Sequence, residues 1–201
     1  DNLLGDHFTL YPLIISPLCW IFGPYTLLLF QIAAISWGGY GVYKFVYQLN
    51  ENHRLALLSC IQFFSIFGIY SALGFDYHDN VVAAMFVPWF LYYFHSEKWL
   101  KSFIYLVLIL IGKENMALWA FFISIGTMLL YYKSKKKIIW SWIFASVSII
   151  YFVGIMHLIP KLSTGQPNYI HWDFSTLGAN MKEVVVNIIT HPKQAFTLLF
   201  E

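Results

Sequence analysis

The sequence has few charged residues and only two cysteines. Asp, Glu, Lys and Arg together make up 11% of its 201 residues, whereas a water-soluble domain carries about 25%. This shortage argues against a soluble enzyme, and a net charge of only +2 provides no basic surface for nucleic acid. Cys19 and Cys60 each lie within an apolar run, which argues against a framework of disulfide bonds.

Apolar and aromatic residues are abundant where charged residues are few. Hydrophobic residues make up 59% of the chain and aromatic residues 20%, and the mean hydropathy is +0.64. The chain holds 8 Trp and 14 Tyr, residue types that are enriched where a membrane meets water. The composition therefore predicts an integral membrane protein.

Three apolar runs are long enough to cross a bilayer as helices, which takes about 20 residues. They comprise residues 25–47, 55–73 and 138–159. Gly74 follows the second run and Pro160 follows the third, as expected where helices end. The sequence thus predicts at least three spanning helices.

Three other apolar segments do not fit a simple span. Residues 10–22 contain two prolines, which predict a short re-entrant or interfacial helix. Residues 81–94 predict a helix that is too short to cross a bilayer unaided. One helix over residues 103–132 would be roughly 45 Å long, so we predict a break at Gly112.

The basic residues indicate an orientation. The cluster from Lys133 to Lys137 is the strongest concentration of positive charge, and such loops stay on the cytoplasmic side. Following the helices from this loop places eight of the 12 basic residues inside and eight of the 10 acidic residues outside. We therefore predict a plasma-membrane protein with a cytoplasmic Lys133–Lys137 loop and a polar cavity on its outer face.

Four segments resemble a family of uncharacterised multi-pass membrane proteins from bacteria and archaea, which itself looks related to the GT-C glycosyltransferases. The segments are LLGDHFTLYPLIISPL at residues 3–18, GFDYHDNVVAAMFVP at residues 74–88, GKENMAL at residues 112–118 and HWDFSTLGANMKEVV at residues 171–185. Family members usually have further helices on both sides, so the resemblance implies that this chain is an internal portion of a longer protein.

The resemblance implies an all-α, polytopic transmembrane bundle of GT-C type. We expect one transmembrane domain over residues 1–201, with an outer loop and re-entrant helix at about 1–23. Membrane helices are expected at 24–159, and an outer loop with interfacial helices at 160–201. The implied function is transfer of a sugar from a polyprenyl-phosphate carrier at the outer membrane face. A transporter or flippase and a non-catalytic membrane scaffold are the alternatives, because broken helices with charged residues also occur along substrate pathways.

Asp6 and His7 lie just before the proline-broken segment on the predicted outer side. Sugar transfer needs a carboxylate that takes a proton from the acceptor hydroxyl, and Asp6 is our candidate for this catalytic base. The alternative is that Asp6 caps a helix starting near Phe8. His7 is a candidate for binding the substrate phosphate.

Asp76, His78 and Asp79 fall within four residues between two membrane segments. Carboxylates and imidazole can bind a divalent metal ion such as Mg²⁺ or Mn²⁺, and the resemblance implies that some members use one. The three residues are our candidate metal ligands. Alternatively, Asp79 or Asn80 caps a helix that begins at Val81.

Lys113 and Glu114 interrupt an apolar stretch. An ionisable residue at the membrane centre costs at least about 2.5–3.5 kcal/mol and usually faces a cavity or a partner. Lys113 is therefore a candidate for neutralising a lipid-linked phosphate, and Glu114 for binding a sugar hydroxyl. The alternative is a structural ion pair or a shallow surface loop.

His171 and Asp173 flank Trp172 in the predicted outer loop. The indole could stack on a sugar ring while the two polar neighbours bind its hydroxyls, so both are candidate substrate ligands. The commoner role of such a tryptophan is to anchor the chain at the interface. The basic loop at Lys133–Lys137 indicates topology and a contact with anionic membrane lipid.

Overall fold

The computed structural model describes residues 7–162, 176–178 and 181–198, and within these ranges the chain forms helices and no strands. The N-terminal turns are α2 (Tyr11–Ile15), η1 (Ser16–Leu18), α3 (Cys19–Phe22) and η2 (Gly23–Tyr25). The following helices are α4 (Thr26–Asn50), α5 (His53–Phe64), α6 (Phe67–Gly74), α7 (Asp79–Ala84), α8 (Val87–His95), α9 (Trp99–Leu110), α10 (Met116–Leu130), α11 (Lys135–Leu162), α12 (Met181–Thr190) and α13 (Pro192–Thr197).

Two of the three predicted spanning helices are present as long apolar helices, and the third is bent. Two helical stretches are long and apolar enough to cross a membrane, residues 11–50 and α11. The α5–α6 pair makes a third candidate span, but it is bent by 46°. The short N-terminal helices match the proline-broken segment predicted for residues 10–22.

Two helix boundaries differ from the prediction. The helix predicted over residues 81–94 is divided into α7 and α8, with Met85 and Phe86 between them. Pro88 lies in the first turn of α8, where a proline is tolerated because its missing amide hydrogen needs no partner within the helix. Inside one continuous helix it would remove a hydrogen bond, so Pro88 favours a break here. Pro160 does not end α11, which continues to Leu162. A proline this close to the end of a helix disturbs little of the hydrogen-bond ladder.

Many large apolar side chains are exposed on the outer surface of the described residues. Trp20 is 94% exposed and Phe67 is 82% exposed, which suits a surface that faces lipid acyl chains. Several polar side chains are buried between the helices together with the apolar core, as hydroxyl groups that hydrogen-bond between helices often are in membrane proteins. Examples on α4, α9, α10 and α11 are Thr26, Gln31, Ser102, Ser124, Thr127, Ser141 and Ser148.

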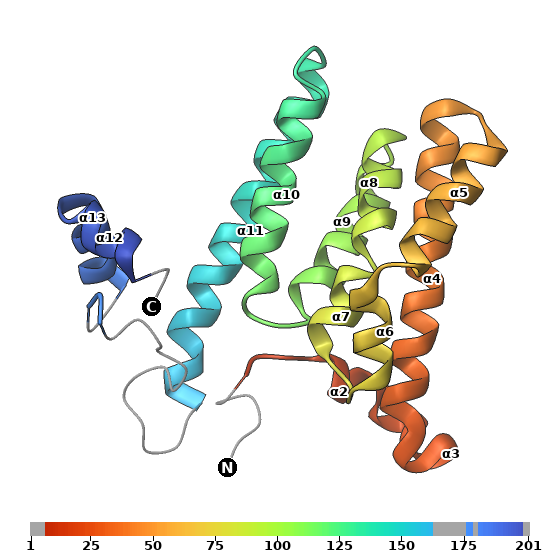
Figure 1. The fold of residues 1–201 in the computed structure, drawn as a ribbon, viewed down its shortest axis with the longest axis horizontal. Coiled ribbons are helices and arrows are strands. Elements are labelled where there is room, and N and C mark those ends of the chain that lie inside the picture. Colours follow the sequence, from red (N-terminus) through yellow and green to blue (C-terminus); the bar gives the residue numbers. More distant parts are fainter. Residues whose placement is uncertain (1–6, 163–175, 179–180, 199–201) are drawn as a thin grey trace.

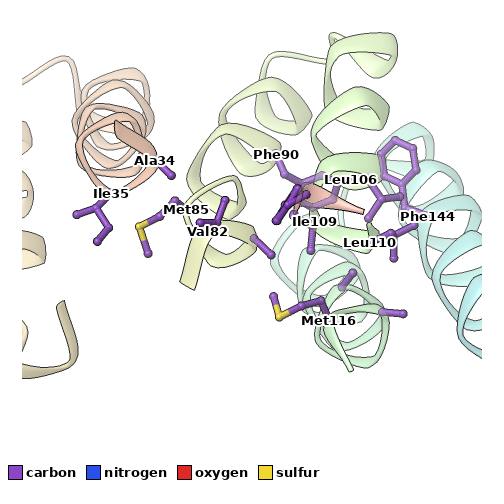
Figure 2. Packing of buried hydrophobic residues seen from close by; sticks show 14 of the residues in the cluster. Ala34, Ile35, Val82, Met85, Phe90, Leu106, Ile109, Leu110, Met116 and Phe144 are labelled. Carbon is purple, nitrogen blue, oxygen red and sulfur yellow. The ribbon is translucent and has the colours of Figure 1, made fainter. Parts of the chain in front are cut away.

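One apolar core runs across the bundle from α4 to α11. Figure 2 shows Val82 and Met85 lying between Ala34 and Ile35 of α4 on one side and the α8–α9 residues on the other. The cluster continues through Phe90, Leu106 and Ile109 to Phe144 of α11. A hydrogen bond of 2.9 Å between the hydroxyls of Thr127 and Ser141 joins α10 to α11 within the bundle.

The connections between helices gather at two ends of the bundle (Figure 1). The basic end, as we call it, holds the turns after α4, α8 and α10. Two contacts join its turns: an ion pair of 2.7 Å from Lys136 to Glu97 and a hydrogen bond of 3.0 Å from Lys137 to the carbonyl of His95. The polar end holds residues 7–10, the α6–α7 loop and the α9–α10 turn.

Candidate functional site

The α9–α10 turn at the polar end is formed by residues 111–115, where the long apolar stretch was predicted to break. Gly112 packs so closely that an added Cβ would lie 2.6 Å from the Cβ of Ala83 and 3.0 Å from the Tyr11 ring. The N-terminal segment lies against this turn, because the amide of Leu10 donates to the carbonyl of Ile111 over 3.0 Å. Tyr11 adds a hydrogen bond from its hydroxyl to the carbonyl of Leu108.

Glu114 is the buried charge of this turn, with 4% of its surface exposed. Its Oε2 accepts a hydrogen bond of 3.1 Å from the backbone amide of Phe8. Its Oε1 lies 2.9 Å from Nδ1 of His7, a distance at which the imidazole donates to the carboxylate. The structure therefore joins two predicted substrate-binding residues that are 107 positions apart.

Lys113 lies beside Glu114 and is half-buried. The sequence alone leaves a structural ion pair between these two neighbours as an alternative. In the part of the chain that the structure describes, Glu114 pairs with His7 and Lys113 forms no ion pair. Lys113 is thus a positive charge at the polar end that no described carboxylate neutralises.

Three tyrosines and a carboxylate extend the cluster beyond Glu114. Tyr151 of α11 interacts electrostatically with the Glu114 carboxylate and with Tyr11. Tyr11 in turn interacts electrostatically with the Asp79 carboxylate and with Tyr77. The hydroxyl of Tyr151 is buried and has no hydrogen-bond partner among the described residues. A buried hydroxyl of this kind can bind a polar group that enters the site.

The α6–α7 loop holds the predicted metal ligands. Asp79 accepts a hydrogen bond of 2.9 Å from the Tyr77 hydroxyl. Burial and the Asp79 carboxylate raise the pKa of Tyr77 above its usual range, so Tyr77 stays protonated and donates this bond. Asp76 accepts instead from the backbone amide of Tyr77 over 2.7 Å. The ring of His78 stacks on Phe75 with 5.5 Å between the ring centres.

These three side chains therefore have separate partners. Among the described residues, no group of three or more His, Cys, Asp and Glu side chains is arranged to hold a metal ion. The divalent-metal site at Asp76, His78 and Asp79 stays a prediction, and it would require these side chains to turn toward one another.

The helix-capping alternative at Asp79 or Asn80 is wrong in the described structure. Helix α7 begins at Asp79 rather than Val81, and its N-cap residue is His78, which makes no side-chain capping bond. The first described helix begins at Tyr11 with Leu10 as its N-cap, and the capping alternative at Asp6 lies outside the described residues. Tyr77 competes for the Asp79 carboxylate and explains why it does not cap α7.

Three predicted site residues lie outside the described residues: the candidate base Asp6 and the candidate sugar ligands His171 and Asp173. Sequence reasoning also missed two residues of the polar end. Gln31 is buried on α4 and binds both the amide of His78 at 2.8 Å and the carbonyl of Ala72 at 2.9 Å. An amide side chain inside an apolar run was the available signal for Gln31, whereas Tyr151 is one of 14 tyrosines.

Comparison with known proteins gives one match. Residues 1–200 match the family DUF2079, whose description is "Predicted membrane protein". No curated protein and no solved structure matches the chain. The match extends over nearly the whole sequence and agrees with the apolar helices and the exposed apolar side chains described above. The chain therefore belongs to DUF2079, a family of predicted membrane proteins.

Proposed function

We propose that this chain is part of a plasma-membrane enzyme of GT-C type that transfers a sugar from a polyprenyl-phosphate carrier at the outer membrane face. The observation that carries the proposal is the buried Glu114 carboxylate, held by His7 and the Phe8 amide at a break between two membrane helices. An ionisable side chain in this setting is costly and marks a functional site by default.

The proposed reaction uses the charges of the polar end. The acceptor hydroxyl attacks the anomeric carbon of the sugar, and a new carbon–oxygen bond forms as the bond to the phosphate oxygen breaks. The bonding electrons leave with the polyprenyl phosphate, whose charge Lys113 neutralises. Asp6 takes the proton of the acceptor hydroxyl as general base. This assigns the phosphate to Lys113 and His7, and the sugar hydroxyls to Glu114, His171 and Asp173.

The proposed steps do not require a metal ion, although the resemblance implies that one could bind. Mg²⁺ or Mn²⁺ would bind at Asp76, His78 and Asp79, where it would offset phosphate charge. Because these side chains have separate partners in the structure, the assignment of Lys113 is made without the metal.

The first test measures binding of a radiolabelled polyprenyl-phosphate sugar to the intact purified protein, with and without Mg²⁺. We expect Lys113→Ala to weaken binding by about tenfold or more, the value of a charge-assisted hydrogen bond of about 1.5–3 kcal/mol. The matched control is Lys101→Ala, which removes a lysine from the basic end. Asp6→Asn should retain binding and lose sugar transfer. Equal affinities of the Lys113 variant and the parent would overturn the phosphate assignment.

A transporter or flippase is the second candidate, and the bend of 46° between α5 and α6 is the observation that favours it. Discontinuous helices line the substrate sites of many transporters. Reconstitution in vesicles separates the two functions, because a flippase moves the lipid-linked sugar between leaflets with no acceptor present. A scaffold would show neither activity and would tolerate alanine at Lys113.

A further inference from the structure

A cavity of about 410 Å³ lies at the basic end, at the turn between α10 and α11. This turn is at the tip of the α10–α11 hairpin, opposite the polar end of α10 (Figure 1). The cavity therefore takes no part in the proposed sugar site. Its lining combines two lysines and one carboxylate with hydroxyl, aromatic and aliphatic side chains: Glu97, Leu130, Tyr131, Tyr132, Lys133, Ser134 and Lys137.

The two lysines of the cavity are held in place by their neighbours. The ammonium of Lys137 donates to the carbonyl of His95 over 3.0 Å and lies 4.3 Å from the centre of the Tyr131 ring. Tyr131 is itself fixed, because its hydroxyl lies 2.8 Å from Nδ1 of His95. The ammonium of Lys133 lies 5.5 Å from the centre of the Tyr132 ring. None of these contacts places a carboxylate against the ammonium group of Lys133 or Lys137.

Negative charge around this cavity is insufficient for its lysines. Glu97 pairs with Lys136 at 2.7 Å, and the hydrogen bond from Lys136 lowers the pKa of the Glu97 carboxyl, so it is ionised. Lys133, Lys135 and Lys137 have no carboxylate partner among the described residues. The first turn of α11 also contains no acidic residue, although this end of a helix favours anions.

The geometry points to a binding site for the phosphate group of an anionic phospholipid. Lys133, Lys137 and the Ser134 hydroxyl would contact the phosphate, since lysine binds phosphate as a point charge. A lipid fits better than a free ion because exposed apolar side chains line the cavity: Leu130 is 62% exposed and Tyr132 is 66% exposed. These side chains would lie along the acyl chains of a lipid whose headgroup occupies the cavity. Basic pockets between membrane helices bind anionic headgroups in the same manner.

The test measures binding of short-chain phospholipids to the intact purified protein by isothermal titration calorimetry. Dihexanoyl-phosphatidylglycerol is compared with dihexanoyl-phosphatidylcholine, and inorganic phosphate is a separate arm. Lys137→Gln and Lys133→Gln each remove one charge of the cavity. Lys101→Gln is the matched control, because Lys101 also stacks on a tyrosine, Tyr93, at 5.4 Å but does not line the cavity.

We expect phosphatidylglycerol to bind more tightly than phosphatidylcholine, and each cavity variant to weaken its binding about fivefold, the contribution of one lysine at a membrane surface. Lys133 is exposed, so its variant tests the site even if Lys137→Gln fails to fold. Equal affinities for the two lipids would overturn the proposal. So would inorganic phosphate binding as tightly as the lipid, or an equal loss in the Lys101 control.

Discussion

Glu114 carries its charge in a buried position, where an ionised side chain is destabilising unless polar groups bind it. It is nearly fully buried, and it lies between α9 and α10 within an otherwise apolar stretch. Its two oxygens accept from His7 and from the Phe8 amide, and these bonds offset the loss of water around the carboxylate. The same bonds tie the N-terminal segment to the α9–α10 turn, so Glu114 has a structural consequence as well as a proposed functional one.

The structural part of this role predicts a difference between two glutamates. Glu114→Ala removes the acceptor for His7 and Phe8, so we expect the free energy of unfolding to fall by about 1.5–3 kcal/mol. Glu97→Ala breaks an exposed ion pair with Lys136 and should cost less than about 1 kcal/mol. Thermal unfolding in detergent measures both variants. Equal losses would contradict the structural role of Glu114.

Individual site residues were predictable from their setting, but their pairing was not. Lys113, Glu114 and His7 were selected because ionisable residues are rare in this sequence and stand next to apolar runs. The bond between His7 and Glu114 joins positions 107 residues apart, and only the packing of the N-terminal segment against α9 and α10 brings them together. Tyr151 gave no signal, because tyrosine is common on both lipid-facing and interior surfaces of such a protein.

At the scale of elements, the break between α9 and α10 depends on Gly112. This residue allows α7, the N-terminal segment and the turn to approach one another, since its Cβ position is already occupied by neighbours. Gly126 lies within α10, and an added Cβ there would meet nothing within 4 Å. Substitution by alanine is therefore expected to change the stability of the protein in opposite directions at Gly112 and at Gly126.

We expect Gly112→Ala to destabilise the protein by about 1–3 kcal/mol, because the new methyl group overpacks against Ala83 and Tyr11. Gly126→Ala should instead stabilise α10 by up to about 0.5–1 kcal/mol, the helical preference for alanine over glycine. Chemical unfolding of the two variants provides the comparison. If Gly112→Ala is as stable as the parent, then the close packing at this turn is not required.

The elements show where sequence patterns are informative. Long apolar runs and the ionisable interruption at residues 113–114 predicted α4, α11 and the α9–α10 break. The division of residues 81–94 into α7 and α8 was missed because both halves are apolar, although Pro88 was an available signal. Met85, at the division, packs closely against Gly38 of α4. The bend between α5 and α6 was missed for the same reason, since no proline or charge marks it.

At the scale of the whole molecule, the two ends of the bundle differ in charge and in the chemistry they offer. The basic end carries the lysines of the α10–α11 turn and a cavity, and the polar end carries Glu114, His7, Asp79 and three tyrosines. The proposed function requires these ends to lie on opposite sides of one membrane, with the polar end outside and the basic end on the cytoplasmic side that the lysine distribution predicts.

The most direct test of this arrangement is labelling of single cysteines in intact cells with a membrane-impermeant maleimide. The parent for this measurement has Cys19 and Cys60 replaced by serine. Asp76→Cys at the polar end and Lys135→Cys at the basic end are both exposed positions. We predict that Asp76→Cys reacts in intact cells and that Lys135→Cys reacts only after the membrane is permeabilised. Labelling of both positions from the same side would contradict the arrangement on which the proposed outer-face site depends.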